Sequence, residues 1–302
     1  MKKIIIFSLS LAAFSVGCDE VDSSMSKDLY PQKVYIVGAR DQLINRDVDL
    51  GKSTDTISVS VAVSGSRPLS KDVTVEFSEN IDEIALYNER NVSGEEVQYQ
   101  MLDSAIYSYP LDELTIKAGQ EYNTYPIYIN PTTLQCDSLY MLPLRLTSIS
   151  DYELADNDTT VLVKLNLTNE YAGLYYVDGL LRNTTDQNDS LFYKMARNLV
   201  ATDDGYTVRM YHYNNETEDY RPTHTFKMSI NEEDNTLSFT TWDEFVIHEG
   251  GGMYYPSMKV YDFWYEYDNN GTRWRAEGLL YKERKSIKEE EDLDDWIEEH
   301  KQ

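Results

Sequence analysis

The chain is built largely from short segments in which apolar and polar residues alternate at every second position. Residues 56–63 read TISVSVAV, so isoleucine and valine fill one side of an extended strand while serine stands on the other. A period of two is typical of a β-strand with one buried and one exposed face. Because the pattern recurs in both halves of the chain, we expect an all-β protein.

The first half of the chain contains about seven of these segments. They lie at residues 34–38, 56–63, 72–77, 113–119, 122–129, 138–146 and 159–167. Seven short strands separated by turn residues favour an immunoglobulin-like β-sandwich over residues 33–169. The cysteine and tryptophan pattern of a true immunoglobulin domain is missing, so the prediction concerns the architecture alone.

The composition changes near residue 170. Of the 25 tyrosines, 14 lie between Tyr171 and Tyr281, and all four tryptophans lie beyond residue 240. Seven further segments read as strands, at residues 174–181, 190–197, 206–213, 224–230, 236–241, 262–267 and 273–281. We therefore predict a C-terminal antiparallel β domain over residues 170–285, either barrel-like or a sandwich. Residues 286–302 are acidic and read as a helical or disordered tail.

The N-terminus has the pattern of a secretory signal. Two lysines precede an apolar run that ends in SVGC, which resembles a bacterial lipobox in which Cys18 is lipidated. The acids that follow resemble an export signal for the outer membrane. We predict a signal peptide over residues 1–17, a lipidated tether over residues 18–32, and a chain anchored in the outer membrane, facing the cell exterior. The alternative is an ordinary signal peptide with an incidental cysteine.

Charge and motifs exclude several function classes. The formal net charge of −26 argues against nucleic acid and against anionic lipid, whose phosphates demand basic surfaces. A neutral glycan, a basic partner or simple solubility remain compatible. The four histidines are scattered, Cys136 has no catalytic companions, and no hydrolase or dinucleotide motif is present. We therefore expect no catalytic residue, no metal and no cofactor.

The segment VYDFWYEYDNNGTRWRAEG contains the first candidate ligand site. If it is a hairpin that turns at residues 268–271, the period of two assigns its faces. The face that we expect in the core holds Tyr261, Phe263, Tyr265, Tyr267 and Trp274. On the other face Trp264 stands among Asp262, Arg275 and further charged residues, an arrangement with which proteins hold sugars. The alternative is that Arg275 merely lies on the Trp264 ring.

A second candidate surrounds three consecutive glycines at residues 250–252. We read them as a loop, because glycines allow the backbone to approach a ligand closely, and Trp242, Tyr254 and Tyr255 flank it. The alternative is a plain flexible connection. One observation distinguishes a glycan site from a protein-binding or structural role, namely whether Trp264, Trp242 and Tyr255 are exposed together in one concavity. If they are buried and dispersed, the predicted glycan site fails.

Two stretches carry a family resemblance. Residues 87–122 and the segment LYMLPLRL look like the N-terminal sandwich domain of surface lipoproteins from starch-utilisation-type glycan uptake systems. The segment YAGLYYVDGLL looks like the start of the C-terminal domain that often follows it. The resemblance implies an outer-membrane uptake complex, partner lipoproteins and glycan as the transported material, but it brings no functional residues.

These observations lead to one prediction with one alternative. We predict a non-catalytic surface lipoprotein that binds polysaccharide or oligosaccharide, or serves as an accessory of an outer-membrane uptake complex. The alternative is a protein-binding or structural surface lipoprotein without a glycan site.

Overall fold

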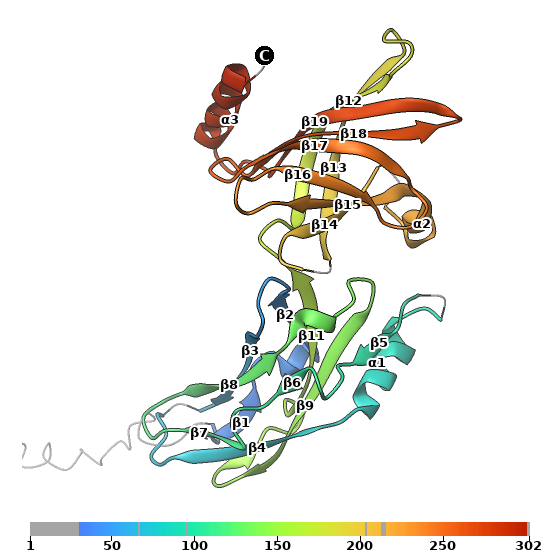
Figure 1. Ribbon diagram of the computed structural model, residues 1–302. Coiled ribbons are helices and arrows are strands. Elements are labelled where there is room, and N and C mark those ends of the chain that lie inside the picture. The colour runs from blue at the N-terminus through green and yellow to red at the C-terminus, as the bar shows by residue number, and fades with distance from the viewer. Residues whose placement is uncertain (1–29, 66, 95, 203, 213–215, 301–302) are drawn as a thin grey trace, which may run out of the picture.

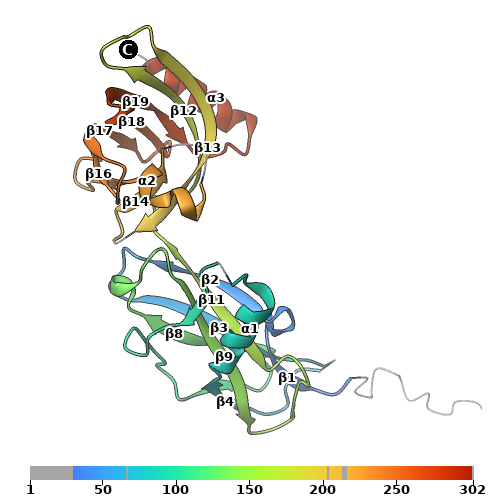
Figure 2. The same cartoon turned by 90° about the vertical axis from the view of Figure 1, so that its right-hand side faces the viewer.

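The structure is a computed structural model, and it describes residues 30–300 apart from residues 66, 95, 203 and 213–215. Two β-rich units lie end to end in both views (Figure 1 and Figure 2), with the N-terminal unit at the bottom and the C-terminal unit above it. The predicted signal peptide, Cys18 and most of the tether lie outside the described residues. In the described part of the chain, no helix combines the length and the apolar character needed to cross a membrane.

The N-terminal unit is a sandwich of two sheets. One sheet has the order β10-β1-β3-β8-β6, formed by β10 (Glu153–Leu154), β1 (Lys33–Ile36), β3 (Asp55–Val63), β8 (Tyr122–Ile129) and β6 (Tyr107–Ser108). The other has the order β2-β11-β9-β4-β7, formed by β2 (Leu43–Asp49), β11 (Thr160–Thr168), β9 (Leu139–Ile149), β4 (Val73–Glu79) and β7 (Glu113–Ile116). A further strand, β5 (Tyr99–Met101), pairs with β9.

A core of mostly aliphatic side chains fills the space between these sheets. Val59, Ile127 and Val163 are fully buried in it, and each comes from an apolar position of an alternating segment. The predicted immunoglobulin-like sandwich is confirmed. Sequence reading missed β2 and the helix α1 (Asp82–Asn91). The short 3₁₀ helices η1 (Ala39–Asp41) and η2 (Pro131–Thr133) lie in the connections.

The C-terminal unit is one eight-stranded antiparallel sheet that curls into a nearly closed barrel. Its strands are β12 (Gly173–Asn183), β13 (Ser190–Thr202), β14 (Thr207–Tyr211), β15 (Thr225–Ile230), β16 (Leu237–Thr241), β17 (Ile247–Tyr255), β18 (Val260–Asn269) and β19 (Thr272–Tyr281). They pair in the order β16-β15-β14-β13-β12-β19-β18-β17. A single bridge between Thr236 and Met253 joins the two edges, so the barrel-like alternative of the prediction is confirmed.

The β18–β19 hairpin has the predicted faces. Asn269 pairs with Thr272 across a two-residue turn, and Asn270 and Gly271 both have a positive φ, as a tight hairpin turn requires. The alternating tyrosines of β18, among them Tyr261 and Tyr265, point into the barrel and are buried. Residues 262, 264, 275 and 277 therefore lie on the outer face.

The glycine triplet is not a loop, so that part of the prediction is wrong. Gly250–Gly252 lies inside β17 and pairs with β18. Gly252 has φ +149°, and a Cβ there would collide with the backbone oxygen of Asp262. These glycines let two strands approach closely at the edge of the curled sheet, which is a common role of glycine inside a strand.

Side chains fix the junction between the two units. Asn169, which is buried, donates to the carbonyl oxygens of Asp204 and Thr207 at 3.2 and 3.0 Å. Asp137 of the N-terminal unit accepts from Arg209 at 2.6 Å and lies 2.8 Å from Arg221. Arg209 extends from the outer face of β14, so an ion-pair cluster connects the sandwich to the barrel.

Three further helical segments belong to the C-terminal unit. The 3₁₀ helix η3 (Glu218–Tyr220) and α2 (Arg221–His224) connect β14 to β15. The acidic end of the chain forms α3 (Ile287–His300), which lies against the outer face of the barrel, at the upper left of Figure 1. Leu293 is the buried contact residue of this helix.

Candidate ligand-binding groove

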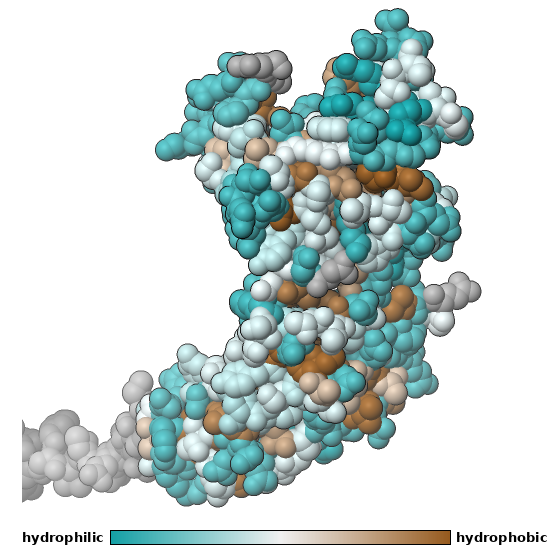
Figure 3. All heavy atoms as spheres, in the orientation of Figure 1, coloured by the Kyte–Doolittle hydropathy of each residue, from teal (hydrophilic) through white to brown (hydrophobic). Residues whose placement is uncertain are grey.

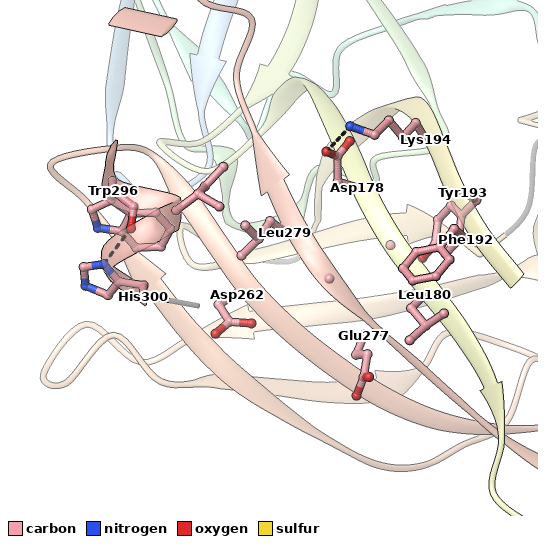
Figure 4. Close-up of a pocket in the computed structure, with 13 residues that line it drawn as sticks. Asp178, Leu180, Phe192, Tyr193, Lys194, Asp262, Glu277, Leu279, Trp296 and His300 are labelled. Atoms are coloured by element: carbon pink, nitrogen blue, oxygen red, sulfur yellow. Dashed lines mark hydrogen bonds and ion pairs between the residues drawn. The ribbon is translucent and has the colours of Figure 1, made fainter. Parts of the chain in front are cut away.

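The outer face of the barrel carries a groove beside α3. It has a volume of about 520 Å³ and is bounded by β12, β13, β18, β19 and α3. Figure 3 shows the hollow between α3 and the projecting end of the β12–β13 hairpin. We call this site the outer groove. Its floor consists of outward-facing side chains of the sheet, and Trp296, Ile297 and His300 of α3 form one wall (Figure 4).

Strand register explains how the floor is assembled. One row across the sheet runs Phe192, Leu180, Glu277 and Trp264, because these residues pair in sequence from β13 to β18. The next row runs Lys194, Asp178, Leu279 and Asp262. All but Trp264 line the outer groove. The floor therefore combines apolar side chains with three carboxylates and one lysine.

Two of the three carboxylates already have partners. Asp178 lies 2.5 Å from the ammonium of Lys194 and accepts a hydrogen bond from the hydroxyl of Tyr281. Glu277 accepts from the guanidinium of Arg275 at 3.0 Å and lies 3.5 Å from Arg182. These contacts fix the orientation of both carboxylates.

Asp262 differs from the other two carboxylates. It has no hydrogen bond or ion pair with any residue that the structure describes. Its oxygens are accessible to solvent, yet the residue sits in the hollow between the sheet and α3. This partial desolvation raises the pKa of Asp262, and the negative charge of Glu277 adds to the rise, while His300 of α3 opposes it. Asp262 is thus a hydrogen-bond acceptor that the fold leaves available.

The first set of predicted site residues is brought together on one face. Trp264 and Asp262 are two residues apart on β18, and the guanidinium carbon of Arg275 lies 4.0 Å from the centre of the Trp264 ring. Arg275 lies on the ring, which was the alternative reading of the sequence. Trp264 is half-buried beside the outer groove but does not line it.

The second set is dispersed. Trp242 lies against Arg209 and Lys227, whose charged groups are 4.7 and 5.2 Å from its ring. Tyr254 points into the barrel and is only 3% exposed. Tyr255 points outward and packs against Trp296 of α3 at 4.7 Å. Trp264, Trp242 and Tyr255 therefore do not share one concavity.

Sequence reading missed two aromatic residues that line the outer groove. Phe192 is 81% exposed on the outer face of β13, and Trp296 contributes to the α3 wall. The alternation in SLFYKMAR puts Phe192 on the side opposite Tyr193, a signal that could have marked it. Trp296 could have been found as the aromatic residue of an otherwise acidic helix.

The described ranges contain no group of three or more histidine, cysteine or acidic side chains arranged to hold a metal ion. Cys136 lies at the junction, with its sulfur 3.7 Å from Arg209. His212 is buried inside the barrel, where its Nδ1 lies 2.7 Å from the Tyr265 hydroxyl.

Comparison with solved structures shows the same two-unit fold in proteins from Bacteroides species. A protein of unknown function from Bacteroides ovatus has 17% sequence identity and a TM-score of 0.61, over 82% of this chain and 93% of that one. An auxiliary nutrient binding protein from Bacteroides thetaiotaomicron has 16% identity and a TM-score of 0.56, over 79% and 90%. At these identities the likeness shows the fold alone. No curated protein sequence matches this chain.

Two family models match the sequence, one for an N-terminal domain over residues 30–153 and one for the C-terminal domain over residues 159–281. The two matches together span most of the chain, and they follow the same order as the sandwich and the barrel. The resemblance drawn from residues 87–122 and from the segment YAGLYYVDGLL is thereby confirmed, and the chain contains both of the domains that these N-terminal and C-terminal models describe.

Proposed function

We propose that this protein is a non-catalytic accessory of glycan uptake at the surface of a Bacteroides-type cell, and that it binds glycan in the outer groove. It would be held in the outer membrane by a lipid on Cys18, with the barrel presented outward. The observation that carries the proposal is the floor of the outer groove, where apolar side chains lie beside carboxylates.

This floor has the chemistry that a sugar requires. Phe192 and Leu180 are neighbours across two strands and offer an apolar platform for the C–H face of a sugar ring. Glu277 and Asp262 lie within the same two rows and accept hydrogen bonds from ring hydroxyls. A concave site that combines an apolar floor with a few converging polar groups is the usual form of a small-molecule site.

The comparisons support a binding role over a catalytic one. The structural relatives with the same two-unit fold bear names of unknown function or of nutrient binding. Two carboxylates at a set separation are needed for glycoside hydrolysis, with one of them protonated at neutral pH. Glu277 is instead held by two arginines and Asp178 by a lysine, an arrangement that suits fixed acceptors.

A titration tests the proposal. The full-length protein is titrated with a panel of soluble polysaccharides, and heat and tryptophan fluorescence are recorded. We expect saturable binding that weakens at least tenfold, about 1.4 kcal/mol, in Phe192→Ala, because exposed aromatic anchors dominate binding energy. Phe192 is exposed, so this substitution leaves the fold intact.

Trp242→Ala is the matched control, because Trp242 lies on a different wall of the barrel, against Arg209 and Lys227. The affinity of Trp242→Ala for glycan should equal that of the wild type. Equal losses in Phe192→Ala and Trp242→Ala would contradict the assignment of the outer groove, and absence of binding across the panel would contradict the glycan role.

A protein-binding role is the second candidate, because the β12–β13 hairpin exposes two adjacent large apolar residues. Leu191 is 54% exposed and Phe192 is 81% exposed, and their hairpin projects from the barrel in Figure 1. Exposed aromatic residues are enriched in protein interfaces. Cross-linking from this hairpin in intact outer membranes distinguishes the two roles, since a partner protein would be captured only in the second.

A further inference from the structure

We propose that the outer groove selects neutral glycans and rejects anionic ones, with Asp262 as the specificity-determining acceptor. This inference rests on the proposed function and narrows it to a class of ligand. It follows from the charges that line the outer groove and from the state of each one.

The charges of the lining are mostly negative. Asp178, Asp262 and Glu277 face a single lysine among the described lining residues, and that lysine, Lys194, is bound to Asp178. The wall belongs to α3, in which eight of the 14 residues are aspartate or glutamate. Apart from Lys194, the lining residue that can carry positive charge is His300, whose Nδ1 lies 2.9 Å from the carbonyl oxygen of Trp296. A carboxylate or sulfate group on a sugar would therefore enter a field that is mostly negative.

The nearest arginines do not change this balance. Arg275 lies on the Trp264 ring and donates to Glu277, while Arg182 lies 3.5 Å from the same carboxylate. An anionic sugar would compete with Glu277 for both guanidinium groups. A hydroxyl group needs no such exchange, because it donates to a carboxylate directly.

Asp262 is the position at which discrimination is strongest. It lies opposite Leu279 on β19, next to the apolar floor, and its carboxylate has no partner among the described residues. A sugar hydroxyl supplies the hydrogen-bond donor that Asp262 lacks. A sugar acid at the same place sets two negative charges side by side in a partly desolvated hollow, where they repel each other.

The test compares polysaccharides that differ in charge. Binding of the full-length protein is measured for neutral polymers (amylopectin, galactomannan, xylan), for anionic ones (chondroitin sulfate, alginate), and for polygalacturonate with and without methyl esters. We expect that any polymer that binds is neutral, that anionic polymers bind at least tenfold more weakly, and that the difference shrinks as salt is raised.

Two substitutions at Asp262 sharpen the test. Asp262→Asn keeps the shape but weakens the acceptor, and we expect a several-fold loss of affinity for the neutral polymer. Asp262→Lys supplies a cation, so anionic polymers should gain at least tenfold in affinity. Asp243→Asn and Asp243→Lys are matched controls, because Asp243 is exposed near Trp242, away from the outer groove. The Asp243 substitutions change the net charge by the same amounts as the Asp262 substitutions. They should leave the affinities for neutral and for anionic polymers unchanged.

The possible outcomes distinguish the proposed glycan binding from the proposed selection of neutral glycans. Binding of an anionic polymer as tightly as a neutral one, lost in Phe192→Ala, would overturn the selection and leave glycan binding in place. Equal effects of the Asp262 and Asp243 substitutions would also overturn the role of Asp262. Absence of binding to any polymer would overturn the proposed function itself, and binding of a basic peptide in its place would point to a protein partner.

Discussion

The two units of this protein bury their strands in different ways. The sandwich packs two sheets face to face and fills the space between them mainly with valine, isoleucine and leucine. The barrel curls one sheet on itself and fills its interior with tyrosine and phenylalanine. Two flat sheets need medium-sized interdigitating side chains, whereas a small barrel has a wide lumen that only large side chains fill.

The aromatic filling has a second consequence. A tyrosine hydroxyl can satisfy a buried polar group, as that of Tyr265 does for His212, which is 7% exposed inside the barrel. Arg197 beside it is 2% exposed. Arg197 donates to the carbonyl oxygen of His212 at 3.2 Å, and His212 contacts Tyr265. Because the lumen is filled, the groove of this barrel lies on the outside, under α3.

The largest expected loss of stability comes from a substitution that creates a cavity in the barrel. Tyr265 is buried at the centre of the aromatic core, so Tyr265→Ala should cost about 3–5 kcal/mol of unfolding free energy. All four tryptophans lie in the C-terminal unit, so denaturation followed by tryptophan fluorescence reports on the barrel.

The matched variant is Ile127→Ala in the sandwich, which should lower the stability seen by circular dichroism and leave the tryptophan transition in place. A shift of the tryptophan transition by both variants alike would show that the two units unfold as one, which would break the comparison.

The next effect depends on pH and belongs to the barrel alone. Burial lowers the pKa of His212 to about 3, and the charges of Arg197 and His224 add to the fall. The unfolded chain binds a proton near pH 6.5 while the folded barrel does not, so stability is lost as pH falls from about 6.5 towards 3. We expect a loss of about 2 kcal/mol at pH 5.

The measurement is the tryptophan transition at pH 7 and pH 5, compared with that of His212→Phe. This variant should lose most of the pH dependence above pH 5, although it changes the stability at pH 7. All four histidines lie in the C-terminal unit, so the circular dichroism of the sandwich should show no corresponding step. An unchanged slope in His212→Phe would assign the pH dependence to the carboxylates.

A smaller effect concerns the junction that joins the two cores. Arg209 is 95% buried and depends on Asp137 across the junction, so Asp137→Ala leaves a buried guanidinium without its carboxylate. We expect a loss of about 1–3 kcal/mol in the tryptophan transition. The solvent-exposed pair of Lys33 and Asp156 is the control, and Asp156→Ala should change the stability less than Asp137→Ala does. Similar losses in both variants would show that the junction is no stronger than a surface contact.

The smallest effect on global stability is expected from α3, which belongs to neither core. Its contacts with the barrel include buried Leu293 and the packing of Trp296 on Tyr255. An isolated helix of this length is marginal in water, so Trp296→Ala should release it. Hydrogen exchange should show lost protection in α3 while the barrel strands keep theirs. Protection that persists in the helix would mean that other contacts hold it.

Local sequence patterns predicted most of the strands. The strands that these patterns missed depend on contacts with distant parts of the chain. The alternation in 56–63 and 262–267 is read directly because one whole face is buried. The edge strand β2 was missed because its LINRDVD sequence buries only Ile44 and Val48. The strand β17 was missed because its glycines, needed for close approach to β18, look like a loop.

The candidate site shows the same division. Trp264 and Asp262 could be placed on one face, since a hairpin fixes its own register. That Phe192 joins them depends on the pairing of β12 with β19, and the wall depends on the docking of α3. Neither contact has a local signal in the sequence.

Both units join an early strand to their last one. β2 pairs with β11 in the sandwich, and β12 pairs with β19 in the barrel, so Leu43 meets Leu162 and Tyr176 meets Tyr281. Contacts between residues so far apart slow folding, because a long loop must close before they form. During synthesis the sandwich can close first, whereas the aromatic lumen stays open until β19 has emerged. The half-made barrel, with its tyrosines uncovered, is therefore the stage at which a growing chain is most exposed to aggregation.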